Sequence, residues 1–231
     1  MNSLAWDPEA LPVVGVLIGC TALFVVLRYR MGVTAWARWV PGTSARLKVS
    51  TGAAGVLLRR LMAGLWLGGG ALLVETASGA DVGVGLALPP LLAGAAWVGW
   101  PMLVLVPLLW RSGQGEALRA VQPEIRDAVW TPRLRVLSMA AWVIYLAGYE
   151  YLFRGAMLFT LEDAFGAWPA IATTSSIYCL AHLHKPMFGE TMGSLFMGIL
   201  LGAMALATGS FLPAMALHVA IAWTTELSSS S

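Results

Sequence analysis

Tyr-Glu-Tyr-Leu-Phe-Arg-Gly, residues 149–155, places two charged side chains inside an apolar run that extends over residues 136–161. Glu150 and Arg154 are four residues apart, so a helix would present them on one face. An ionisable side chain at the centre of a bilayer costs at least about 2.5 kcal/mol on insertion scales, so such residues are usually functional. The stretch therefore predicts a membrane-spanning helix that carries part of a site.

Composition extends this prediction to the whole chain of 231 residues. Charged residues make up only 11% of it and hydrophobic residues 58%, whereas soluble domains carry about 25% charged residues. The net charge of +2 is small, and the basic residues gather in two segments, so nothing supports a nucleic-acid partner. Cys20 and Cys179 lie in separate apolar runs without metal-type spacing. These features predict a membrane protein without a disulfide framework.

Several apolar runs have about the length of a bilayer-spanning helix, which takes roughly 20 residues. They cover residues 11–27, 61–76, 84–109, 136–161, 168–183, 191–207 and 212–227. We therefore predict an all-α fold, a polytopic membrane helix bundle of about seven transmembrane helices that forms one domain over residues 1–231. Gly64 and Gly68 in the second run, and Gly198 and Gly202 in the sixth, predict close helix packing.

Charge distribution predicts the orientation in the membrane. A basic cluster without acids follows the first run, comprising Arg28, Arg30, Arg38, Arg46, Lys48, Arg59 and Arg60. The positive-inside rule makes this segment cytoplasmic, so the N-terminus is expected outside and the C-terminus in the cytoplasm. Glu75 and Asp81 are expected in an outer loop. Residues 111–135 predict an amphipathic helix at the cytoplasmic surface, with a solvated loop containing a short helix as the alternative.

Glu150 and His182 are expected to meet at one depth. Glu150 lies 12 residues before Glu162, and His182 lies 14 residues after Trp168. At a rise of about 1.5 Å per residue, both lie roughly 18–21 Å from the same outer turn. Because the two helices are antiparallel neighbours and His218 lies in the middle of the last run, the three side chains can converge. The sequence predicts a site within the bilayer, nearer its cytoplasmic side.

Further polar residues flank His182. Tyr178 precedes it by one turn and Lys185 follows it, while Pro186 should end the helix. Glu190 opens the next helix, where it can pair with Lys185. Whether that pair is structural or catalytic remains open in the sequence.

Three motifs resemble those of the CPBP family, the CAAX-prenyl-endopeptidase-like and bacteriocin-processing intramembrane proteases, also called Abi proteins. They are Glu150-x-x-x-Arg154-Gly155, Tyr178-x-x-x-His182 and the late His218. The resemblance covers residues 140–226 and implies a catalytic core over residues 134–227. With a single glutamate in its first motif, the chain is similar to a bacterial branch, which implies a location in the inner (plasma) membrane.

The chain departs from the common family pattern at three positions, Tyr149, Tyr178 and Ala222. They stand where the family has a leading glutamate, a phenylalanine and an asparagine or aspartate. The family assigns the leading glutamate to water activation and the late polar residue to the oxyanion. The resemblance therefore leaves Glu150 or Glu190 as the base, with Thr225 or Glu226 as a substitute near His218. Tyr149 is expected only to pack against a neighbouring helix.

The resemblance implies hydrolysis of a peptide bond in a membrane-embedded protein or peptide, inside the lipid bilayer and without a cofactor. Glu150 and His182 would activate water, and His218 and Arg154 would stabilise the oxyanion. Supporting roles would fall to Tyr178, Lys185 and Thr225. One alternative is a zinc-dependent protease with Glu150, His182 and His218 as ligands. The other is an inactive scaffold or transport protein that retains the fold.

Overall fold

A computed structural model describes residues 10–30, 35–36, 38, 41–79, 85–182 and 188–230. These residues confirm the all-α fold. The elements are α1 (Ala10–Arg30), α3 (Thr43–Leu47), α4 (Thr51–Ser78), α5 (Leu91–Gly113), α6 (Glu116–Val121), α7 (Pro132–Glu150), the π-helix η1 (Tyr151–Met157), α8 (Leu158–Phe165), α9 (Ala167–Leu180), α10 (Phe188–Thr208) and α11 (Leu212–Ser229).

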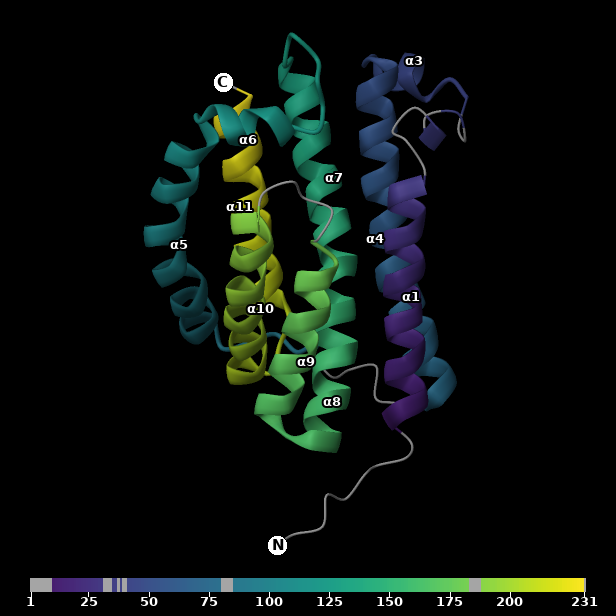
Figure 1. Ribbon diagram of the computed structural model, residues 1–231, viewed down its shortest axis with the longest axis vertical. Coiled ribbons are helices and arrows are strands. Elements are labelled where there is room, and N and C mark those ends of the chain that lie inside the picture. The colour runs from purple at the N-terminus through teal and green to yellow at the C-terminus, as the bar shows by residue number, and fades with distance from the viewer. Residues whose placement is uncertain are drawn as a thin grey trace, which may run out of the picture.

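The long helices run up and down one bundle (Figure 1). The short helices α3 and α6 and the end of α11 lie at one end of the bundle, and the start of α1 lies at the other. Among the described residues, four helices are long and apolar enough to cross a membrane: Thr51–Ser78, Leu91–Gly113, Pro132–Phe165 and Thr191–Thr208. A shorter apolar helix covers Val13–Val26. The protein is an integral membrane protein whose architecture is compatible with about seven spans, and its orientation stays a prediction.

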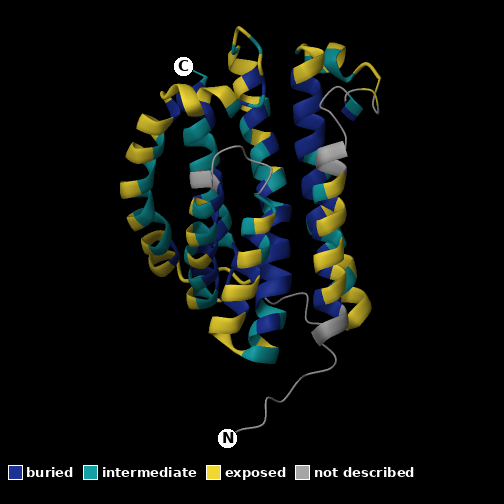
Figure 2. Ribbon diagram, in the orientation of Figure 1, coloured by how far each residue is buried: buried dark blue, intermediate teal, exposed yellow. Residues whose placement is uncertain are grey.

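Burial separates the helices that support the centre from those that face the surroundings (Figure 2). Exposed residues follow the outward side of α5, where Leu92 and Trp100 keep 86% and 73% of their surface accessible. Large apolar side chains exposed in a row suit contact with lipid chains. Buried residues instead fill the centre of α7, η1 and α4, so the polar groups on these helices are withdrawn from lipid.

Glycines allow α4 and α7 to touch through their backbones, as the spacing of Gly64 and Gly68 predicts. A Cβ atom on Gly148 of α7 would clash with the carbonyl oxygen of Gly64, and one on Gly68 would lie 2.8 Å from the Cα of Gly148. The second predicted pair also packs closely, because a Cβ on Gly198 of α10 would lie 3.0 Å from the Cβ of Ser175 on α9. These contacts hold the site-bearing helices at short distance.

Helix starts follow local capping chemistry. The Ser50 side chain accepts a hydrogen bond from the Ala53 N–H, 2.9 Å away, at the start of α4. Thr131 caps α7 in the same way through the Leu134 N–H, at 3.2 Å. Each cap satisfies a backbone donor that has no partner within its helix. The two caps lie at the same end of the bundle, where they fix the α4–α7 pair.

The structure corrects one expectation and refines two others. Glu75 does not lie in a loop, because α4 continues to Ser78 and the Tyr151 hydroxyl donates a hydrogen bond to the buried Glu75 carboxylate. Asp81 lies outside the described residues. The third apolar run becomes helical only after Pro90, since α5 begins at Leu91. Within residues 111–135, the helix beyond the end of α5 and before the start of α7 is the six-residue α6.

Candidate active site

Glu150 and Arg154 form the buried centre of the site. Glu150 is the last residue of α7, and Arg154 lies in the π-helix that continues the same rod. Both side chains are 0% exposed, and Arg154 Nη1 lies 3.2 Å from Glu150 Oε2. The opposite charges compensate each other where water cannot. The pair predicted from the spacing of four residues is thus formed.

His218 joins this pair from α11. Its Nδ1 atom lies 2.5 Å from Glu150 Oε1. A carboxylate paired with a guanidinium accepts hydrogen bonds, so Nδ1 carries the proton and Nε2 of the neutral ring keeps its lone pair. The Tyr178 hydroxyl lies 3.5 Å from that Nε2 atom. Glu150 therefore selects the tautomer of His218 and fixes the plane of its ring.

His182 lies in the turn that follows α9 and faces the same region. Its Nδ1 atom is 2.9 Å from the Tyr178 carbonyl oxygen. A carbonyl oxygen only accepts, so the proton again lies on Nδ1, and Nε2 of the neutral ring is an acceptor. The rings of His182 and Tyr178 pack with their centroids 4.5 Å apart. Helix depth predicted that Glu150, His182 and His218 converge. In the structure, both histidines line one cavity.

That cavity has a volume of about 740 Å³. Its lining includes Tyr149, Tyr178, His182 and His218, and also Glu124 in the segment after α6. Much of the remaining lining is apolar, with Leu105, Leu109, Met197 and Leu200 among its residues. Glu150 and Arg154 are not among the described residues that line the cavity. Among the described residues, the ion pair is therefore set back from the cavity, and Glu150 contacts the lining residue His218.

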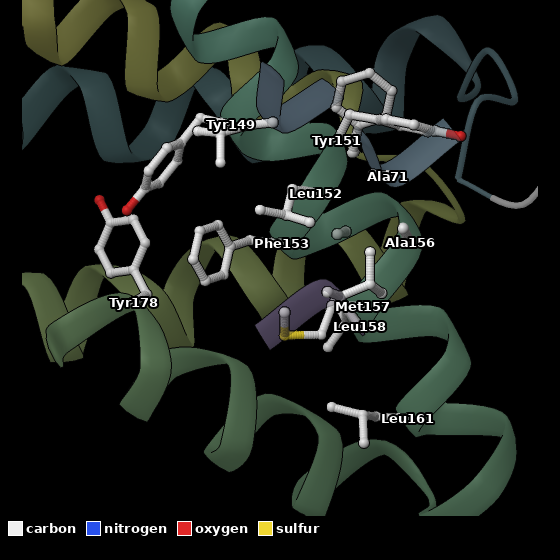
Figure 3. Close-up of a cluster of buried hydrophobic side chains, with 14 of the residues drawn as sticks. Ala71, Tyr149, Tyr151, Leu152, Phe153, Ala156, Met157, Leu158, Leu161 and Tyr178 are labelled. Atoms are coloured by element: carbon white, nitrogen blue, oxygen red, sulfur yellow. The ribbon is translucent and has the colours of Figure 1, made fainter. Parts of the chain in front are cut away.

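Aromatic rings pack together beside the two histidines of the cavity. Figure 3 shows Tyr149, Tyr178 and Phe153 gathered on one side of the buried cluster. The centroid of the Tyr149 ring lies 4.8 Å from that of Phe153 and 5.7 Å from that of Tyr178. The Arg154 guanidinium carbon lies 4.4 Å from the Tyr178 ring centroid. Such a cation–π contact adds to the pairing that keeps Arg154 in place.

The other predicted residues divide into three groups. Thr225, seven residues after His218 on α11, lines the cavity, and so does Ala222. Lys185 lies outside the described residues, and so does the side chain of Glu190, whose backbone belongs to α10. Glu226 is directed elsewhere, because its carboxylate binds a cluster of side chains at the α6 end of the bundle.

That cluster was not predicted as such. Arg60 is 2% exposed, with Nη2 lying 3.1 Å from Glu226 Oε1 and Nη1 lying 2.7 Å from the Ser138 hydroxyl. The Trp142 indole donates a hydrogen bond to Glu226 Oε2 at 2.5 Å, and Glu124 binds Arg60 at 3.3 Å. The cluster joins α4, α7 and α11 to the segment after α6. A glutamate and an arginine in apolar runs were its signals in the sequence, but the sequence analysis used Arg60 only as part of the cytoplasmic basic cluster.

A comparison with known families assigns the part of the chain that carries the site. Residues 131–224 match the model of the Rce1-like family. The matching description is type II CAAX prenyl endopeptidase, Rce1-like, so the family resemblance based on the motifs is confirmed. The Rce1-like region contains Glu150, Arg154, His182 and His218. No curated protein and no solved structure matches the chain at a significant level.

The described residues of the bundle contain no group of three or more His, Cys, Asp or Glu side chains that could hold a metal ion. The Nδ1 atom of His218 is hydrogen-bonded to Glu150, so these two atoms face each other instead of facing a common metal position. The arrangement is therefore that of an oriented imidazole beside a cavity.

Proposed function

We propose that this protein is an intramembrane endopeptidase that hydrolyses a peptide bond in a membrane-associated substrate. The observation that carries the proposal is the 2.5 Å contact between Glu150 and His218 at the wall of a cavity inside the Rce1-like region. A buried carboxylate bonded to one nitrogen of an imidazole orients the ring and stabilises its protonated form. The other nitrogen can then act as a general base toward water in the cavity.

The reaction divides between these residues as follows. His218 Nε2 takes a proton from water while the water oxygen bonds to the scissile carbonyl carbon, and the carbonyl π-electron pair moves to oxygen. His182 Nε2 accepts the other hydrogen bond of the water and orients it. The tetrahedral intermediate then collapses, the C–N bond breaks, and His218 returns its proton to the leaving nitrogen. Glu150 stays ionised throughout, with Arg154 balancing its charge.

In this mechanism Glu150 contributes to water activation only indirectly, through His218. A direct base needs to lie within hydrogen-bond reach of the water. The Glu150 side chain is 0% exposed and its Oε1 atom is occupied by His218. The arrangement favours a Glu150–His218 pair over Glu150 alone, and Glu190 is the alternative carboxylate.

We infer that the substrate is a protein or peptide ending in a prenylated CAAX sequence. The family description supplies this class. The cavity supports it, because apolar walls on α5 and α10 could receive a prenyl chain while the polar end receives the peptide. The exposed α5 surface would let such a substrate arrive from the bilayer.

A cleavage assay tests the proposal. The purified protein, reconstituted in liposomes, should cleave an internally quenched peptide with a farnesylated CAAX terminus. His182→Ala should lower kcat by about 100-fold or more, because it removes the group that positions the water for proton transfer to His218. Ser176→Ala is the control, since Ser176 lies on the exposed side of α9 and bonds only within its helix. Equal rates for the two variants would refute the role of His182, and an inert wild type would favour the inactive scaffold.

Chelation separates the proposed mechanism from its zinc-dependent alternative. Because the proposed steps use only side-chain acids and bases, wild-type cleavage should be unchanged after incubation with a strong chelator. Elemental analysis of the same preparation provides the second measurement. Loss of cleavage, restored by adding zinc, would support Glu150, His182 and His218 as metal ligands instead.

A further inference from the structure

Hydrogen-bond donors near the two histidines are almost all directed away from the cavity. His218 donates through Nδ1 to Glu150, and His182 donates through Nδ1 to the Tyr178 carbonyl oxygen. In both neutral rings Nε2 is then an acceptor. The Tyr178 hydroxyl, 3.5 Å from Nε2 of His218, can only be the donor in that contact. The two histidines therefore present acceptor nitrogens, which suits water activation, while the Tyr178 hydroxyl is a donor directed to His218.

Hydrolysis also needs a donor, because the carbonyl oxygen becomes negatively charged in the tetrahedral intermediate. The sequence assigned this role to Arg154 and His218. Arg154 is 0% exposed, is not among the described residues that line the cavity, and packs against the Tyr178 ring. His218 has its proton on the nitrogen that faces Glu150. The oxyanion therefore needs another hydrogen-bond donor.

Tyr149 has the position and the chemistry for this role. It lines the cavity, and its ring centroid lies 6.1 Å from that of His218 and 5.7 Å from that of Tyr178. Figure 3 shows the Tyr149 hydroxyl pointing toward the space beside Tyr178. The hydroxyl oxygen of Tyr149 forms no hydrogen bond with any residue that the structure describes. It also keeps some accessible surface, unlike the fully buried unpaired atoms of the described residues. The phenol O–H is thus available to a group in the cavity.

We propose that Tyr149 is a catalytic residue whose hydroxyl donates a hydrogen bond to the oxyanion of the tetrahedral intermediate. This inference rests on the proposed function and adds to it a group that the sequence expected only to pack. The hydroxyl keeps its proton during the reaction. Tyr149 would therefore contribute a donor at the position where the resembling family has a carboxylate, and proton acceptance is left to the Glu150–His218 pair.

Binding of two uncleavable peptides tests this role without depending on turnover. Both carry the farnesylated CAAX terminus, one with a phosphonate in place of the scissile carbonyl and one with an N-methylated amide. Calorimetric titration should show Tyr149→Phe binding the phosphonate about 10- to 100-fold more weakly than wild type, the range for a lost hydrogen bond to a charged group. Affinity for the neutral peptide should be unchanged, because phenylalanine keeps the ring contacts.

Tyr151→Phe is the matched control. It removes a phenol hydroxyl two residues further along the chain. The Tyr151 hydroxyl binds Glu75 on α4, and Tyr151 is not among the described cavity-lining residues. Phosphonate affinity should stay at the wild-type value, with thermal melts confirming that both variants fold. Equal weakening of both peptides by Tyr149→Phe, or no weakening, would overturn the proposal, as would a wild type that does not bind the phosphonate.

Cleavage of the unmodified peptide by wild type is measured in parallel. Phosphonate binding that depends on Tyr149, in a protein that does not cleave, would refute the endopeptidase function while supporting the oxyanion site. Cleavage by Tyr149→Phe at the wild-type kcat would refute the role of Tyr149 and leave the endopeptidase function intact.

Discussion

Glu150→Gln should lower kcat for the farnesylated peptide by about 10³- to 10⁴-fold, with the protein still folded. The estimate follows the effect of neutralising the carboxylate that orients a catalytic histidine in other hydrolases. Glutamine keeps the size of the side chain, but its amide cannot stabilise a protonated His218, and its N–H₂ group can hold the ring in the wrong tautomer. Substrate binding should change little, because Glu150 is not among the described cavity-lining residues.

Steady-state kinetics in liposomes and a thermal melt in detergent measure the two parts of this prediction. Glu190→Gln is the informative comparison, since Glu190 is the other carboxylate that the family resemblance leaves as a base. It should retain much more activity than Glu150→Gln. An inactive Glu190→Gln beside an active Glu150→Gln would make Glu190 the base and Glu150 a structural partner of Arg154.

Gly148→Ala should destabilise the bundle by about 3 kcal/mol, at the upper end of the usual cost of overpacking. The added methyl group would clash with the carbonyl oxygen of Gly64 in the closest contact between α4 and α7. Backbone atoms cannot turn aside as a flexible side chain can, so the helices would have to separate. Glu150 lies two residues further along α7, so activity should fall together with stability.

Gly69→Ala is the matched control for this clash. Gly69 lies on α4 directly after the packing residue Gly68, and a Cβ atom there would meet nothing within 4 Å. Replacing glycine by alanine inside a helix should stabilise it by up to about 1 kcal/mol. The melting temperature of Gly148→Ala should therefore fall and that of Gly69→Ala should not. Equal melting temperatures would show that the α4–α7 contact is less tight than the structure has it.

The sequence was sufficient to predict which segments form helices and how deep along each helix the polar residues lie. The lengths of the apolar runs gave an all-α membrane bundle, and the regular helical rise placed Glu150, His182 and His218 at compatible heights. The spacing of four residues between Glu150 and Arg154, and between Gly64 and Gly68, predicted an ion pair and a close helix contact. Each inference depends on geometry within one helix, which is nearly independent of what packs against it.

Rotation of each helix about its axis, and the choice of partners across helices, were decided only by tertiary packing. Apolar residues cover nearly every face of these helices, so periodicity could not tell which side of α7 faces the cavity. The sequence therefore left Tyr149 as packing and either Glu150 or Glu190 as the base. The structure instead turns Tyr149 to the cavity and leaves Glu150 behind its wall.

The same reason explains why the buried partners of Glu75 and Arg60 were not predicted. Hydropathy counting assigned Glu75, at the end of an apolar run, to a loop, and charge counting used Arg60 only to orient the chain. Partners distant in the sequence keep both side chains inside the bundle: Tyr151 binds Glu75, and Glu226 binds Arg60. The sequence determines where along a helix a charged residue lies. Whether that charge faces water or a buried partner depends on which helices pack together, because burial is tolerated only where a second chain segment supplies the compensating group.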